Sequence, residues 1–159
     1  MDIRTKTAAA AIAIALITLF KYSIPARAGE SRYSASNDRW QAECASCHIA
    51  YAPQLLPAAS WQRLMAGLDK HFGTDASIDA AAAAEIGRFL DANAARGKRA
   101  QQGAGALRIT QTAWFSRKHD EVPARTWSRP EVRGASNCTA CHSLAERGDF
   151  SERSVRIPE

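Results

Sequence analysis

The sequence predicts a mainly α-helical protein built as two lobes of unequal regularity. Between residues 29 and 97, apolar side chains recur at intervals of three and four, the period of an amphipathic helix. Glycine and proline interrupt residues 98–159, and strand-like runs of Val, Ile and Thr are lacking around the cysteines. We therefore expect a helical lobe in residues 29–97, then a linker and a less regular lobe in residues 98–159.

Two helices are predicted early in the first lobe. One begins near Asn37, a typical N-cap residue, and runs into Cys44. The second begins near Ser60 and ends at Gly73, which fits a C′ position. Its apolar face consists of Trp61, Leu64, Met65, Leu68 and Phe72. Between the two helices, prolines predict an extended loop over residues 51–57.

A third helix is predicted over the alanine-rich residues 77–96, closed by Gly97. Its small side chains would let it pack closely against the first helix. Residues 98–106 carry two glycines and no apolar period, which indicates a linker. In the second lobe, residues 110–122 predict a short helix on which Phe115 and His119 would be neighbours one turn apart.

Every cysteine of the chain lies in one of two Cys-x-x-Cys-His motifs, at residues 44–48 and 138–142. This is the attachment signature of c-type haem. The two thiols add to the two vinyl groups on one porphyrin edge, and the adjoining histidine turns its imidazole onto the iron. We therefore predict two covalently attached haem c groups. The thioether residues are Cys44, Cys47, Cys138 and Cys141, and the adjoining iron ligands are His48 and His142.

A structural zinc site and a redox dithiol are the alternative uses of such cysteine pairs. The two pairs are separated by 91 positions, from Cys47 to Cys138, whereas the pairs of a zinc ribbon lie about 15–20 residues apart. A thioredoxin-like dithiol needs a βαβ context, which the flanking sequence does not supply. Both alternatives are disfavoured, and the histidine after each pair favours haem.

The number of histidines matches the number of axial ligands that two bis-histidine haems need. The chain has four, two in the motifs and two outside them, His71 and His119. His71 follows His48 by 23 residues, and His119 precedes His142 by 23. From this proximity we assign His71 to the first haem iron and His119 to the second. The reverse assignment, in which each reaches across to the other lobe, stays open.

Other sixth ligands are conceivable at both irons. Met65 is the only methionine besides the initiator, and a thioether ligand would raise the reduction potential. However, it shares the helical face of Trp61 and Leu68, where methionine usually fills the core. At the second iron the alternative to His119 is an open or water-filled position. With imidazole on both sides of both irons, we predict low potentials.

Residues 1–28 resemble a cleaved signal peptide. A net-positive start precedes an apolar stretch at residues 8–20, and Ala26-Arg27-Ala28 offers a cleavage site. Thirteen residues are too few to span a bilayer comfortably, so we expect export to the periplasm. This segment contributes +3 of the net charge of +5, and no nucleic-acid partner is indicated. Residues 98–159 carry +4, which could steer an acidic redox partner or offset the haem propionates.

Short motifs in both lobes resemble those of one known family. In the first lobe they are Cys44-Ala-Ser-Cys-His48, Tyr51-Ala-Pro-Gln-Leu-Leu-Pro57, Ser60-Trp61 and His71-Phe72-Gly73. In the second they are Arg108-Ile109-Thr110, Trp114-Phe115, His119-Asp120-Glu121, Asn137-Cys138-Thr-Ala-Cys-His142 and Gly148-Asp149-Phe150. Together they resemble the small bacterial dihaem cytochrome c family, DHC, over essentially all of residues 29–159.

This resemblance implies a first lobe similar to a class I cytochrome c and bis-histidine ligation of both haems. The four ligands would then be His48, His71, His119 and His142. It also implies electron transfer between a membrane b-type cytochrome and a small oxygen-binding c-type cytochrome.

Two classes of function are compatible with two haems. In an electron carrier both irons are six-coordinate, so no small-molecule substrate binds and no reaction is catalysed. In a dihaem enzyme, such as a peroxidase, one iron keeps an exchangeable site. Dihaem peroxidases are expected to be larger, and no spare histidine, methionine or acid and base cluster marks a distal pocket here. We therefore expect a carrier rather than an enzyme.

Overall fold

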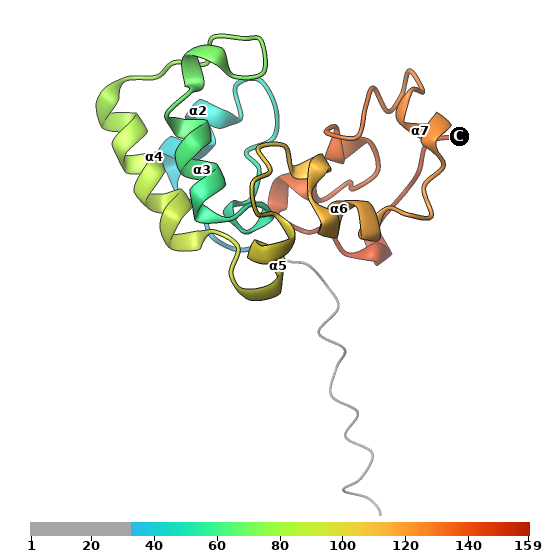
Figure 1. Cartoon of the computed structure of the whole chain (residues 1–159). Coiled ribbons are helices and arrows are strands. Elements are labelled where there is room, and N and C mark those ends of the chain that lie inside the picture. Colours follow the sequence, from blue (N-terminus) through green and yellow to red (C-terminus); the bar gives the residue numbers. More distant parts are fainter. Residues whose placement is uncertain (1–32) are drawn as a thin grey trace, which may run out of the picture.

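The structure, a computed structural model, describes residues 33–159, so the predicted signal peptide lies outside the described residues. Within this range the protein is built from helices and turns and has no β-strand, which confirms the mainly α-helical prediction. Figure 1 shows helices α2, α3 and α4 on one side of the molecule and α6 and α7 on the other, with α5 below them. The first side is the more regular of the two.

Helix α2 spans Asp38–Cys44, as predicted. The side-chain oxygen of Asn37 accepts a hydrogen bond from the Trp40 backbone nitrogen at 2.8 Å, which satisfies a free N–H at the helix start. The Asn37 amide nitrogen also donates to Glu85 Oε1 at 2.9 Å. Because Glu85 lies on helix α4 (Ala80–Asn93), the cap of one helix also ties it to another.

Helix α3 spans Ala58–Met65 and is shorter than predicted at its end. It begins after Pro57, whose fixed φ and missing N–H suit a helix start, so Ser60 lies inside the helix and is not its cap. The helix ends at Met65 with Ala66 as its C-cap, and a 3₁₀ turn follows at Leu68–Lys70. Phe72 and Gly73 then adopt positive φ angles of 51° and 99°. His71 consequently lies on a loop rather than on a helical face.

Helix α4 ends at Asn93, before the predicted boundary at Gly97. The chain leaves it because Ala95 donates from its backbone nitrogen to the Leu56 carbonyl at 2.9 Å, which draws this segment alongside the loop before α3. Gly97 does not close α4 but begins helix α5, Gly97–Gln102. The segment predicted as a linker is therefore partly helical.

The first lobe has an apolar core of its own. Helix α4 packs against both α2 and α3. The buried residues between them are Trp40, Leu56, Trp61, Ile86, Leu90 and Ala94. A smaller cluster, Ala52, Leu55, Trp114 and Phe115, lies where the two lobes meet, and Tyr51 packs against both clusters.

The second lobe consists mostly of turns. Its helices are α6, Ala113–Lys118, and α7, Ala124–Trp127. Single 3₁₀ turns make up its other elements, at Ile109–Gln111, Cys138–Ala140, Ala145–Arg147 and Glu152–Ser154. Gly148 has a φ of 71°, and an added Cβ there would collide with the Tyr33 carbonyl. Since Tyr33 also donates to Gly148 O at 2.9 Å, glycine allows the start of the described chain to lie against this lobe.

Candidate haem sites

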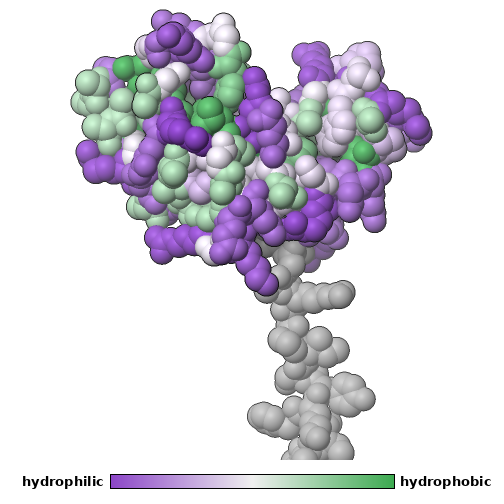
Figure 2. Space-filling view, viewed as in Figure 1, coloured by the Kyte–Doolittle hydropathy of each residue, from purple (hydrophilic) through white to green (hydrophobic). Residues whose placement is uncertain are grey.

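The first motif opens onto a cavity of about 610 Å³ in the first lobe. Both cysteines of this motif, His48 and His71 line it. Its apolar walls come from α2, α3 and α4 and include Trp40, Trp61, Leu64, Met65, Ile86 and Leu90. Figure 2 shows hydrophobic side chains gathered in a hollow of this lobe with hydrophilic side chains around it. An apolar cavity of this kind suits a flat, hydrophobic macrocycle.

His48 and His71 face each other across this cavity. Their ring centroids are 6.1 Å apart, and their planes are inclined by 26°. A metal bound by both rings, with metal–nitrogen bonds of about 2.0–2.1 Å on each side, places the ring centres about 6 Å apart. The separation therefore fits a metal held between the two imidazoles.

Local contacts fix the ring of His48. Its Nδ1 lies 2.7 Å from the Ile49 carbonyl, and the ring stacks on Tyr51 at a centroid distance of 4.8 Å. Nδ1 bonded to a carbonyl leaves Nε2 as the free ligand atom. Burial, with His48 and Arg108 nearby, lowers the pKa of His71. His71 is thus kept neutral, the form that binds a metal.

The second motif brings His142 opposite His119. Their ring centroids are also 6.1 Å apart, but the planes are inclined by 78°. His119 ends helix α6, where its Nδ1 lies 2.9 Å from the Phe115 carbonyl and its ring stacks on Phe115 at 4.0 Å. The predicted contact one turn apart is confirmed. Burial and the nearby His119 lower the pKa of His142, while Asp149 acts in the opposite direction.

The two histidines outside the motifs therefore lie beside the motif histidines to which sequence proximity assigned them. In each pair one Nδ1 is tied to a backbone carbonyl. The Nδ1 atoms of the other two, His71 and His142, are buried without a hydrogen-bond partner among the described residues. Met65, the alternative ligand, lines the first cavity and packs against the apolar core.

The described residues give no support to the zinc alternative. Within residues 33–159, no group of three or more His, Cys, Asp or Glu side chains is placed to hold a metal ion. Burial raises the pKa of Cys44 and of Cys138 to about 11; Glu43 adds to the rise at Cys44, whereas a backbone hydrogen bond partly opposes it at Cys138.

The two sites adjoin each other, which the spacing of the motifs does not reveal. Cys138 and Ser136 of the second lobe help to line the first cavity. The Tyr51 hydroxyl donates to the Ser136 carbonyl at 2.7 Å. Burial, and to a lesser extent Cys138, raises the pKa of Tyr51 to about 12. Tyr51 thus links the surroundings of His48 to the second motif.

Two further aromatic rings lie next to the histidines. Phe150 lies 5.4 Å from the His142 ring, and Phe72 lies 4.8 Å from the His71 ring with the Arg108 guanidinium 4.0 Å above it. Phe72 directly follows its histidine and was already named in the His71-Phe72-Gly73 motif. Phe150 was also named in a motif, but only the structure shows that a turn of the chain returns its ring to His142.

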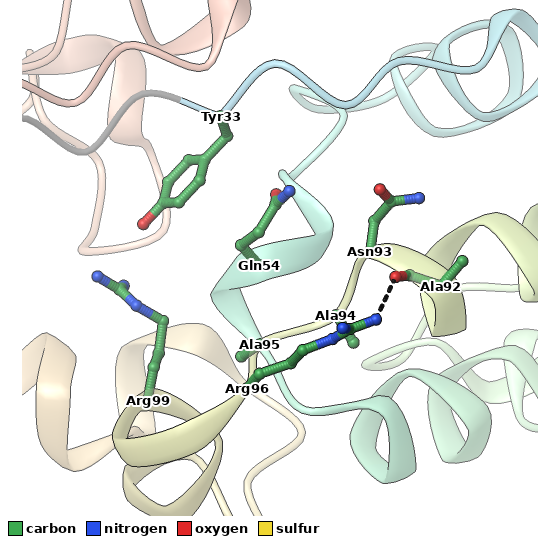
Figure 3. A pocket seen from close by; sticks show the side chains of 8 residues that line it. All are labelled: Tyr33, Gln54, Ala92, Asn93, Ala94, Ala95, Arg96 and Arg99. Atoms are coloured by element: carbon green, nitrogen blue, oxygen red, sulfur yellow. Dashed lines mark hydrogen bonds between the residues drawn. The ribbon is translucent and has the colours of Figure 1, made fainter.

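A second cavity, of about 410 Å³, lies away from the histidines and is lined by Tyr33, Gln54, Arg96, Arg99 and residues 92–95. Figure 3 shows these side chains around it, with Arg96 hydrogen-bonded to the Ala92 carbonyl. The Arg99 guanidinium lies 4.4 Å from the centre of the Trp114 ring. None of the predicted site residues lines this cavity.

A helical fold with two Cys-x-x-Cys-His motifs, each facing a second histidine, defines a c-type cytochrome with two haem sites. The family model of dihaem cytochrome c matches residues 40–150. The chain belongs to this family. Membership implies two covalently attached haem c groups and electron transfer, consistent with a carrier.

Solved structures agree with this family. A diheme cytochrome c from Rhodobacter sphaeroides is 44% identical, with a TM-score of 0.65, and the match covers 74% of this chain and 99% of that one. The diheme cytochrome c of Shewanella baltica OS155 is 43% identical, with a TM-score of 0.68 and coverage of 77% and 93%. No curated protein matches the chain. None of the helices within residues 33–159 has the length and apolar character needed to cross a membrane.

Proposed function

We propose that the protein is a periplasmic electron carrier with two bis-histidine haems. The proposed ligands of the first iron are His48 and His71, and those of the second are His119 and His142. The observation that carries this proposal is that both pairs face each other at a ring separation of 6.1 Å. With both positions of each iron taken, no position is left for a substrate.

The side chains of the protein would hold and insulate the redox centres. Cys44 and Cys47 tether the first haem, and Cys138 and Cys141 the second. The haem supplies one-electron exchange when it is bound. The backbone carbonyls of Ile49 and Phe115 orient His48 and His119 and make these imidazoles better donors.

Low reduction potentials are expected for both haems. Two imidazoles stabilise ferric iron better than an imidazole and a thioether, so each potential should lie below that of a typical His/Met cytochrome c. The proposed partners are a membrane b-type cytochrome as donor or acceptor and a small oxygen-binding c-type cytochrome. Family resemblance supports these partners, and the +4 charge of residues 98–159 is compatible with an acidic one.

Visible spectra of the purified holoprotein, with and without carbon monoxide, test the ligation. The wild type should show two low-spin haems that do not bind carbon monoxide when reduced. His71→Ala and His119→Ala should each open one haem of the two to carbon monoxide. Met65→Leu is the matched control and should leave both haems low-spin.

A high-spin band or tight carbon monoxide binding in the wild type would contradict the proposal and favour a peroxidase-like enzyme with one open iron. If Met65→Leu loses a low-spin signal and His71→Ala does not, the sixth ligand of the first iron is the Met65 thioether and not His71.

A further inference from the structure

The two histidine pairs share a separation but differ in ring orientation. The planes of His48 and His71 are inclined by 26°, and those of His119 and His142 by 78°. The pairs are thus nearly parallel at the first site and nearly crossed at the second, although both centroid distances are 6.1 Å.

Ring orientation matters because an imidazole donates π electrons to the iron perpendicular to its own plane. Two parallel rings raise the energy of the same iron d orbital and separate it from its partner. Two crossed rings raise both orbitals equally and leave them nearly degenerate. In low-spin ferric iron, a large separation gives a rhombic paramagnetic resonance signal. Near-degeneracy gives a strongly anisotropic signal with a large maximal g value.

Contacts at the second site hold the crossed arrangement. The Phe115 ring lies 4.0 Å from the His119 ring and within 21° of its plane, and the Phe115 carbonyl accepts from His119 Nδ1 at 2.9 Å. Phe115 is itself 9% exposed. Its backbone nitrogen donates to Thr112 Oγ1, the N-cap of α6, at 3.2 Å. Phe115 therefore holds His119 through both its ring and its carbonyl, and the helix cap holds Phe115 in turn. The Trp127 ring also lies 5.9 Å from the His119 ring, but it is inclined by 60° and does not stack on it.

We infer that the two haem sites are electronically unequal and that Phe115 is the positioning residue that keeps the second pair of imidazoles crossed. The inference rests on the bis-histidine ligation proposed above. Tyr51 stacks on His48 within 30° at the first site, so each site has its own aromatic ring that sets the plane of one ligand.

Paramagnetic resonance of the oxidised holoprotein at low temperature tests the inference. The wild type should give two low-spin ferric signals of equal intensity, one rhombic and one with a large maximal g value. Phe115→Leu keeps an apolar side chain and the backbone carbonyl but removes the flat ring that stacks on His119, so the large-g signal should shift or broaden. Because Phe115 also lines the first cavity, the rhombic signal should change less than the large-g signal. Phe115→Tyr retains the ring and should retain the large-g signal.

Phe89→Leu is the matched control, because Phe89 packs against Trp40 in the first core at 5.2 Å and is not among the residues that line the first cavity. It should leave both signals unchanged. Two low-spin signals of the same type, or an unaltered large-g signal in Phe115→Leu, would overturn the inference while leaving the ligation intact. A high-spin signal in the wild type would instead refute the ligation itself.

Discussion

The two lobes present the same five-residue motif on different scaffolds. In the first, the motif begins at the last residue of the capped helix α2, and helices α2, α3 and α4 enclose an apolar core of six buried residues. In the second, the motif lies on a 3₁₀ turn between loops. Several of the buried side chains there are polar, among them Thr112, Thr126, Asp149 and Ser151.

This difference separates two ways of building a haem site. The first lobe buries enough apolar surface to order its helices around the cavity. The second has short helices of six and four residues, below the length at which a helix is stable alone. Covalent attachment and two axial bonds would supply the missing cross-links, as metals do in small domains. Folding of the second lobe should therefore depend more strongly on its haem.

The largest expected effect comes from removing one pair of tethers at a time. Cys138→Ala/Cys141→Ala should leave one haem per chain and make residues 113–159 susceptible to proteolysis, while far-ultraviolet circular dichroism retains the signal of α2–α4. Cys44→Ala/Cys47→Ala is the matched variant, which removes the haem of the first lobe. The first lobe should then lose less protease resistance than the second lobe loses when its own haem is removed. Equal protease resistance of the two lobes would contradict the comparison.

A smaller effect is expected from shortening a buried side chain in the core of either lobe. Ile86→Ala, at a position with 0% exposure, should lower the free energy of unfolding by about 2–5 kcal/mol. Val132→Ala, at 1% exposure in the second lobe, removes two methyl groups and should cost about 2 kcal/mol. Denaturant titration followed by tryptophan fluorescence measures both. If the second lobe folds only around its haem, Val132→Ala should also lower haem content, whereas Ile86→Ala should not.

The smallest effect concerns the contact between the lobes. Tyr51→Phe removes the hydrogen bond to Ser136 but keeps the ring on His48, so it should cost about 1 kcal/mol at pH 7. Burial raises the pKa of Tyr51 from 10.0 to about 12. The neutral hydroxyl is thus favoured in the folded state, and its contribution is present below pH 10 and lost as the pH rises towards about 12.

Denaturation of wild type and Tyr51→Phe at pH 7 and at pH 11 measures this contribution. The difference in stability between them should shrink at the higher pH. A difference in stability that is the same at both pH values would contradict the raised pKa of the Tyr51 hydroxyl in the folded state.

Much of this architecture could be read from local patterns. Asn37 caps α2, the alanine-rich segment forms α4, and residues 113–118 form α6, because capping and apolar periodicity act over a few residues. The errors lie where distant segments compete with local preference. Helix α4 stops at Asn93 because Ala95 bonds to Leu56.

The sequence by itself determined the kind of site: two motifs for covalent haem attachment, each with its adjoining histidine, because such a motif consists of contiguous residues. It also holds two more histidines, the number that the proposed bis-histidine ligation would need. Only the tertiary structure decided which histidine faces which motif, that Tyr51 joins the two sites, and that one ring pair is parallel and the other crossed. These properties depend on contacts between residues far apart in the chain, where side-chain packing, not local spacing, sets distance and angle.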